Sequence, residues 1–308
     1  MVDTVGRIDG PPVSLLRDAA TGAVLMEVER ADVSDLLALG WRWPEPFTAK
    51  AADGTTDLYG ATWRPSWSDG SERLPVITMV YPGPQITLVP KTSFKANLRE
   101  SLGNIFCQQL AELGFVVVAV DPRGTALRDR AFRLHSYGNL GGTHQHEDYI
   151  AVLRQLAERA PDMDLERVGI QGHSGGGYST ARAMLTFPDF FKVGVASAGN
   201  HDIRGVLAMW CESFQGPAAR FPWDNLDNAA LASNLKGKLL LAYSDMDENV
   251  HPGLTLRLVD ALIRHDKDFD LLVIPNAGHD FAATSPYFLK RLWNYFVEHL
   301  HGGTPPPH

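Results

Sequence analysis

A serine stands at the centre of residues 172–176, whose sequence is GHSGG. The pattern G-x-S-x-G is typical of a nucleophile elbow, a strained turn between a strand and a helix that exposes the serine hydroxyl. Glycine suits the positions two residues away because side chains there would collide with neighbouring backbone. Residues 168–170 predict a short buried strand before the turn, and residues 178–187 predict a helix after it. Ser174 is therefore the candidate nucleophile, and the helix N-terminus would direct its amides at the developing oxyanion.

A serine hydroxyl is a weak nucleophile until a base removes its proton. In this architecture the chain order is serine, acid, histidine. Asp247 follows a predicted strand at 238–243, and His279 follows a predicted strand at 269–274. We expect both side chains beyond strand ends, where open α/β sheets build their sites. His279 would deprotonate Ser174, and Asp247 would hold the tautomer of His279 and stabilise its cation.

The elements that must position these groups alternate along the chain. The sequence predicts strands at 58–63, 76–80, 115–120, 168–170, 193–196, 238–243 and 269–274, and helices at 96–113, 144–159, 178–187, 254–264 and 286–299. Strands separated by helices predict an α/β fold with a mostly parallel central sheet and helices on both faces.

The first 45 residues differ from the rest. They predict a hairpin, with strands at 14–18 and 23–28, followed by a stiff proline-rich linker at 41–46. A lone hairpin is marginal in water, so we expect it to pack on the hydrolase domain or on a partner chain. The expected domains are an N-terminal hairpin and linker at 1–45, a catalytic domain at 46–300 and a disordered tail at 301–308.

The composition narrows the class of protein. The chain has 308 residues, 44% of them hydrophobic and 21% charged, with a formal net charge of -8. The acidic balance argues against nucleic-acid binding, and no apolar run approaches the length of a membrane span. Only two cysteines are present, and the N-terminus shows no signal peptide, so we expect a cytoplasmic protein without a disulfide framework.

From about residue 47 to 299 the sequence resembles the catalytic domain of the prolyl oligopeptidase family, nearest to its dipeptidyl-peptidase IV branch. The motifs that carry the resemblance are the elbow together with VYPGP at 80–84, the strand ending in VDPRGT at 115–125, SAGNHDIR at 197–204, DMDENVHP at 245–252 and AGHDF at 277–281. The resemblance implies an α/β-hydrolase fold and a serine peptidase, and it identifies the N-terminal hairpin as a remnant of the family's β-propeller.

The same resemblance implies roles for further residues. It assigns the acid to Asp247, with Asp245 as the fallback. It pairs the phenol of Tyr81 with the amide of Gly175 as the oxyanion hole, and Tyr81 also lies just beyond the strand at 76–80, from which this fold supplies its second donor. Asn249 would bind a substrate carbonyl, although a role as a turn residue is an equal alternative.

The substrate pocket is expected from Val250, Val206 and Trp210. The last two belong to an aromatic-rich segment at 201–223, which predicts either a pocket wall or ordinary core packing. Family members that cleave after proline carry aromatic side chains around the proline ring. Gly175 and Val206 stand where two of these are expected, which argues against proline specificity.

Two further segments could bind a metal or a phosphate. His144, His146, Glu147 and Asp148, with His135 nearby, resemble metal ligands but open a predicted helix, where acidic residues suit the dipole. No lysine closely follows the glycines of the elbow, so a phosphate-binding loop is disfavoured. We therefore expect no metal and no cofactor.

The sequence as a whole predicts a serine hydrolase that forms an acyl-enzyme on Ser174, most simply a peptidase acting on short peptides or amides. An esterase or acyl transferase would use the same triad, and an inactive subunit that docks a partner domain is the alternative from another class. The expected partners are a peptide or small acyl substrate, and either a second copy of the chain or a propeller-like partner. Substrate identity and oligomeric state are not encoded in any motif.

Overall fold

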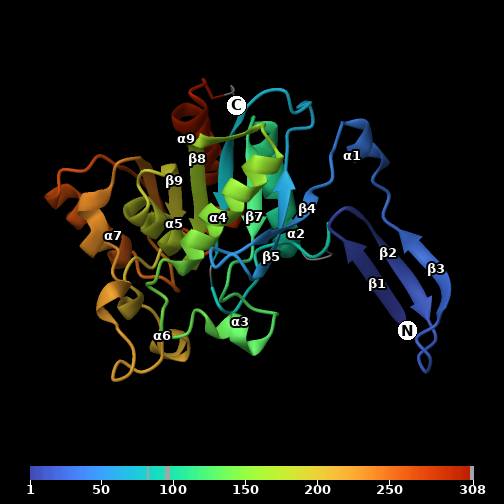
Figure 1. The fold of residues 1–308 in the computed structure, drawn as a ribbon, viewed down its shortest axis with the longest axis horizontal. Helices are drawn as coiled ribbons and strands as arrows, with labels where there is room; N and C mark the ends of the chain where they lie inside the picture. Colours follow the sequence, from blue (N-terminus) through green and yellow to red (C-terminus); the bar gives the residue numbers. More distant parts are fainter. Residues whose placement is uncertain (82, 94–97, 306–308) are drawn as a thin grey trace.

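A computed structural model describes residues 1–308 except 82, 94–97 and 306–308, and the side chains of 98–104 are also not described. Its centre is an eight-stranded sheet with the order β11-β10-β9-β8-β6-β7-β5-β4 (Figure 1). The strands are β4 (Glu45–Lys50), β5 (Asp57–Trp63), β6 (Leu74–Met79), β7 (Val116–Val120), β8 (Met163–His173), β9 (Phe191–Ser197), β10 (Lys238–Ser244) and β11 (Asp270–Ile274). The strands from β11 to β7 pair in parallel, whereas β5 and β4 are antiparallel to their neighbours.

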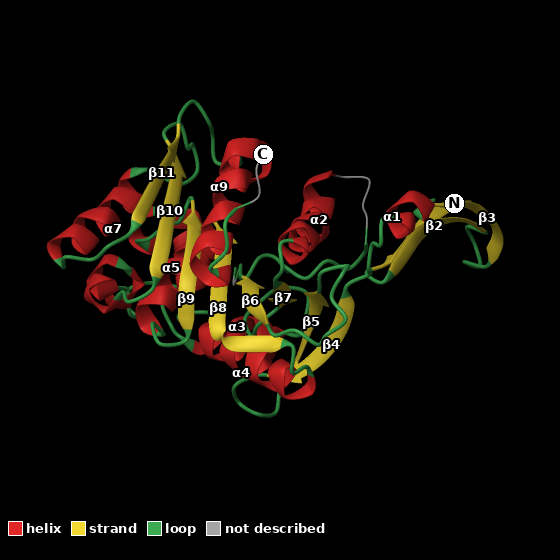
Figure 2. Cartoon of the chain, turned by 90° about the horizontal axis from the view of Figure 1, so that it is seen from above, coloured by secondary structure: helices red, strands yellow, loops and turns green. Residues whose placement is uncertain are grey.

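Helices cover both faces of this sheet (Figure 2). The apolar residues of α4 (His144–Arg159), α5 (Gly175–Thr186) and α7 (Gly253–Arg264) pack on one face, and those of α2 (Leu98–Glu112), α8 (Phe281–Thr284) and α9 (Pro286–Phe296) pack on the other. Strand β7 explains why two cores form: Val116, Val118 and Val120 join one cluster, while Val117 and Ala119 join the other. Alternate side chains of a strand point to opposite faces, so a continuous apolar run is buried on both. The predicted α/β-hydrolase fold is confirmed.

The remaining elements are short. They are α1 (Ser34–Ala38), α3 (Arg130–Leu134), α6 (Ala208–Gln215), the 3-10 turns Ile203–Gly205, Asp224–Leu226 and Ala229–Asn234, and a π-helical turn, Val297–His301, that continues α9. The predicted disordered tail at 301–308 therefore begins with a helical residue, and its last three residues lie outside the described part of the chain. The first two residues of the helix predicted at 96–113 also lie outside it.

An arm of three strands extends from the body (Figure 1). Strands β1 (Val2–Arg7), β2 (Gly10–Arg17) and β3 (Val24–Arg30) form an antiparallel sheet of their own, and no residue from 1 to 43 is buried. The predicted hairpin is β2 with β3; β1 was not predicted. The arm meets the hydrolase body at the β1–β2 turn, where Ser93 donates hydrogen bonds from its amide to the Arg7 carbonyl (2.8 Å) and from its hydroxyl to the Gly10 carbonyl (2.6 Å).

Two predicted boundaries are wrong. Residues 41–46 were expected as a linker, but β4 begins at Glu45 and pairs Pro46 with Ala61 at the sheet edge, where proline is tolerated. The helix expected from residue 178 begins instead at Gly175, directly after the serine. Close backbone packing at the elbow outweighs the low helix propensity of the three glycines.

Candidate active site

Ser174 occupies a strained turn between β8 and α5. Its φ of 60° and ψ of -119° lie outside the regions that ordinary residues favour. Hydrogen bonds hold the turn on both sides, because the Ser174 amide donates to the Ser197 carbonyl (2.8 Å) and the Tyr178 amide donates to the Ser174 carbonyl (3.0 Å). The strain is supported by the sheet and the helix, and it presents the hydroxyl beyond the end of the strand.

The flanking glycines permit this turn by allowing backbone to approach backbone. A Cβ on Gly172 would lie 2.5 Å from the carbonyl oxygen of Gly176, and a Cβ on Gly176 would lie 2.3 Å from the carbonyl oxygen of Val80. Real Cβ atoms do not approach backbone oxygens so closely, so both positions require glycine.

A chain of hydrogen bonds joins the serine to a histidine and an aspartate. His279 Nε2 lies 2.9 Å from Ser174 Oγ, and His279 Nδ1 lies 2.8 Å from Asp247 Oδ2 and 3.0 Å from Oδ1. Both His279 and Asp247 are buried. This pattern assigns the proton to Nδ1, which donates to the carboxylate, and leaves Nε2 to accept from the serine hydroxyl. The structure thus brings the three predicted residues together.

The acidic loop after β10 holds Asp247 in place. Its Oδ1 accepts hydrogen bonds from the amides of Asn249 (2.9 Å) and Val250 (2.7 Å). Asp245, the predicted fallback, instead accepts from the Asn276 amide (2.7 Å) and braces the loop after β11. The geometry therefore favours Asp247 over Asp245 as the group that orients His279.

Tyr81, the candidate oxyanion donor, lies close to Ser174. Burial raises the pKa of its phenol above the ordinary value, while hydrogen bonding with Ser174, Gln85 and the Gly175 backbone opposes that rise. The phenol is therefore protonated near neutral pH and can donate to an oxyanion. Its hydroxyl is within hydrogen-bond reach of both Ser174 and the Gly175 backbone.

His173 is a neighbour of the triad that the sequence analysis did not single out. Its Nδ1 lies 3.0 Å from Ser197 Oγ, and its ring centroid lies 4.9 Å from that of His279. Burial, with a smaller contribution from the charge of His279, lowers the pKa of His173 to about 4. His173 is thus neutral near pH 7 and adds no positive charge beside the base. In the sequence, His173 was marked only by its position directly before the serine of the elbow motif.

A small cavity adjoins Gly175. Its volume is about 30 Å³, and it is lined by Gly83, Pro84, Leu140, Gln145, His146, Gly175, Tyr178, Ser179, Asn200, Ile203 and Trp210. Of the predicted pocket residues, Trp210 is in this lining and Val206 is not, although both pack against the apolar cluster that includes Ile203. Asn249 is exposed, and Val250 is buried. The sequence analysis missed Asn200, although it lies within the SAGNHDIR motif.

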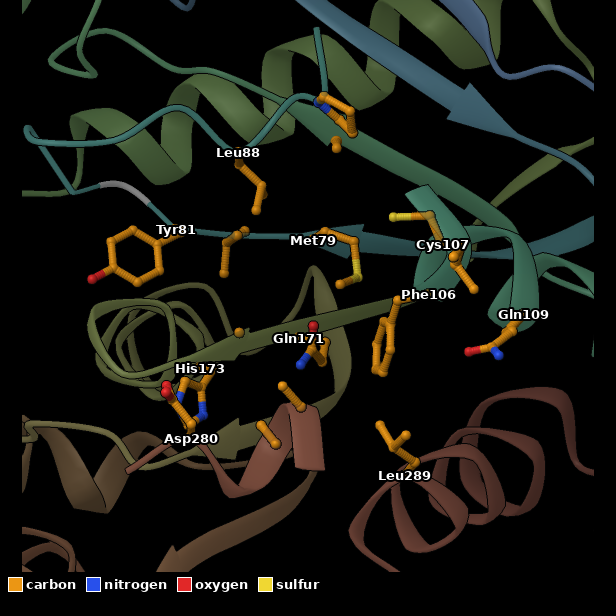
Figure 3. Close-up of a pocket in the computed structure, with 17 residues that line it drawn as sticks. Met79, Tyr81, Leu88, Phe106, Cys107, Gln109, Gln171, His173, Asp280 and Leu289 are labelled. Carbon is orange, nitrogen blue, oxygen red and sulfur yellow. The ribbon is translucent and has the colours of Figure 1, made fainter. Parts of the chain in front are cut away.

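A larger cavity of about 320 Å³ lies between α2 and the α8–α9 side of the sheet (Figure 3). The side chains of Phe106 and Leu289 point toward one another across it, and His173 and Asp280 lie at one end. Ser174, His279 and Asp247 line neither cavity. The larger one meets the elbow at Gly172 and His173, and the smaller one meets it at Gly175.

The cluster of histidines and acids at the start of α4 has structural partners. His144 Nδ1 lies 3.0 Å from the Asn139 amide nitrogen, His146 Nε2 lies 2.9 Å from Ser179 Oγ, and Asp148 forms an ion pair with Arg123 at 2.8 Å. Within the described residues, no group of three or more histidine, cysteine or acidic side chains is arranged to hold a metal.

The two cysteines are free and buried. Burial raises the pKa of Cys107, and it raises that of Cys211 to about 11, so neither is a thiolate at neutral pH. In the part of the chain that is described, no helix is both long and apolar enough to cross a bilayer.

Comparisons with known proteins identify relatives of this chain. The chain is 30% identical to human dipeptidyl peptidase 8 over 83% of its own length and 28% of that protein, and 26% identical to mouse prolyl endopeptidase FAP over 89% of its length and 35% of that protein. The solved structure of a dipeptidyl aminopeptidase IV candidate from Bacteroides ovatus superposes with a TM-score of 0.86 at 27% identity, covering 97% of this chain and 41% of that one.

The chain thus spans well under half the length of the relatives it matches. The model of the prolyl oligopeptidase family matches residues 105–303, which include the elbow, the acidic loop and the histidine loop. This chain belongs to the prolyl oligopeptidase family of serine peptidases.

Proposed function

We propose that the chain is a serine hydrolase that cleaves short peptides or amides through an acyl-enzyme on Ser174. The observation that carries the proposal is the hydrogen-bonded chain from Ser174 through His279 to Asp247, at 2.9 and 2.8 Å. Family membership supports peptides as the substrate class.

The geometry supports a stepwise mechanism. Ser174 Oγ attacks the substrate carbonyl carbon as its proton passes to His279 Nε2, and Asp247 stabilises the resulting imidazolium. The Gly175 amide and the Tyr81 hydroxyl donate hydrogen bonds to the oxyanion. His279 then gives the proton to the leaving amine as the scissile bond breaks. A water molecule repeats these steps on the acyl-enzyme and releases the acid.

Active-site labelling tests the proposal. A fluorophosphonate probe forms a covalent bond only with an activated serine, so we expect it to label the wild-type protein and not Ser174→Ala. The matched control is Ser233→Ala, which changes an exposed serine in the 3-10 turn Ala229–Asn234. Labelling that persists in Ser174→Ala would overturn the mechanism.

A substrate panel then separates peptidase from esterase. Dipeptide anilides with free and with blocked amines, compared with short-chain nitrophenyl esters, report which acyl donors are turned over. We expect the anilides to be hydrolysed; hydrolysis of the esters alone would identify an esterase on the same triad.

We also place the enzyme in the cytoplasm, since both cysteines are buried and unpaired.

A further inference from the structure

The small cavity beside Gly175 is on the acyl side of the nucleophile. The leaving group must depart next to His279, because His279 protonates it. Ser174, His279 and Asp247 do not line the cavity, whereas Gly175, the residue after the nucleophile, does. The larger cavity instead meets the elbow at His173, whose ring packs on His279, so the small cavity is the one on the side away from the base. The side chain of the residue that acylates Ser174 would point into it.

Asn200 is one of several residues with polar side chains in the lining, which also holds Gln145, His146, Tyr178 and Ser179. Only 4% of Asn200 is exposed, and among the described residues its Oδ1 is buried without a hydrogen-bond partner, as are the Tyr178 hydroxyl and His146 Nδ1. Ile203 and Trp210 form an apolar part of the same lining. A buried amide without a partner is destabilising, and it is satisfied when a ligand brings a matching donor or acceptor. The amide can turn over, so either its oxygen or its nitrogen can meet that ligand.

The size of the cavity limits the ligand. Its volume is about 30 Å³, which suits a small side chain rather than a bulky one. The side chain of serine has two heavy atoms and ends in a hydroxyl, which both donates and accepts. The proline ring and the leucine side chain are larger and offer no hydrogen bond.

We propose that Asn200 makes the acyl pocket selective for a small side chain that carries a hydroxyl, with serine as the best fit, at the residue whose carbonyl Ser174 attacks. This inference rests on the proposed function, since it needs Ser174 to be acylated. It names the substrate class of the same site and departs from proline as the preferred residue.

Peptide aldehydes test the inference without depending on turnover, because they add reversibly to an activated serine. Four N-blocked dipeptide aldehydes, identical except for a terminal serine, alanine, proline or leucine side chain, compete with the fluorophosphonate for Ser174. In the wild type we expect the serine aldehyde to protect about five- to tenfold better than the alanine aldehyde, as expected for one added hydrogen bond. We expect the proline and leucine aldehydes to protect least.

Two variants of Asn200 identify the cause. Asn200→Leu keeps the size and removes the hydrogen bond, so the ratio of serine to alanine protection should fall to about one. Asn200→Ala also removes the amide but leaves space, and should shift the preference toward the larger apolar side chains. The control Ile203→Val trims the apolar wall and keeps the amide, so the serine-to-alanine ratio should persist. Labelling of each variant by the probe alone shows that its elbow is folded.

The outcomes separate the two proposals. If Ser174→Ala still labels, the proposed function fails and this inference fails with it. If the wild type labels but alanine or proline aldehydes protect as well as serine, the inference alone is wrong. A serine preference that survives in both Asn200 variants would also overturn the role of Asn200.

Discussion

Replacing Asp247 with asparagine should disable the base while leaving the loop intact. The amides of Asn249 and Val250 donate to Oδ1 at 2.9 and 2.7 Å, so they would hold the new amide oxygen at that position. The new NH₂ group would then take the place of Oδ2, which faces His279 Nδ1 at 2.8 Å. Because two N–H groups cannot point at each other, His279 must move its proton to Nε2.

A proton on Nε2 prevents His279 from accepting the proton of Ser174. The imidazolium also loses the carboxylate that stabilises it. We expect kcat on a peptide anilide to fall about 10⁴-fold, or roughly 5.5 kcal/mol of transition-state stabilisation. The KM and the thermal unfolding midpoint should change little, since the backbone hydrogen bonds to the side chain are kept.

Asp245→Asn is the matched control for this change. Asp245 is two residues away, and within the described residues it accepts a hydrogen bond from the Asn276 amide at 2.7 Å, a bond that an asparagine oxygen also accepts. We expect its kcat to stay within about twofold of the wild type, because charge at that site does not touch His279. A kcat for Asp247→Asn above one tenth of wild type, or an equal loss in both variants, would refute the assignment of the acid.

Two further predictions concern the oxyanion and the buried histidines. Tyr81→Phe removes one of two donors, so kcat should fall about 10²- to 10³-fold, while an unchanged kcat would leave the Gly175 amide as the sole donor. Burial lowers the pKa of His146 and of His201 to about 3, so each is neutral in the folded state and, once unfolded, titrates near 6.5. Below pH 6.5 each histidine takes up a proton in the unfolded chain but not in the folded protein. The free energy of unfolding is therefore unaffected above pH 6.5 and falls as the pH drops toward 3, by roughly 2 kcal/mol for each histidine at pH 5. In urea unfolding, the free energy of unfolding of His201→Gln should fall less between pH 7 and pH 5 than that of the wild type. An equal fall in both proteins would contradict this.

The order of strands and of candidate catalytic residues could be predicted because both depend on long apolar runs. The strand at 116–120 is buried on both faces, and such runs are visible in sequence. Asp247 and His279 follow adjacent parallel strands, β10 and β11, whose register pairs Ser244 with Ile274 at their carboxyl ends. Parallel pairing therefore brings two residues more than thirty positions apart to one edge of the sheet, beside the elbow.

The parts that could not be predicted lack this kind of signal. Strand β1 has no buried residue, so its pattern carries no core-facing alternation. Asn200 was not predicted as a site residue either. Polar residues in loops are usually exposed, and the burial of this one is visible only in the packed structure. Val206 was expected in the pocket from its position in the sequence; it directly follows the 3-10 turn Ile203–Gly205 and does not line the small cavity.

The glycine run of the elbow has two different functions within three residues. A Cβ on Gly177 would lie 2.4 Å from the Ser197 carbonyl oxygen, which is fixed in β9, so glycine is required there for folding. A Cβ on Gly175 would meet only the side chain of Tyr81, at 3.3 Å, which a small adjustment relieves. Glycine at 175 is therefore not required by the backbone. Because Gly175 also lines the small cavity, its missing side chain leaves the remaining lining residues, Asn200 among them, to determine which side chain the cavity would accept.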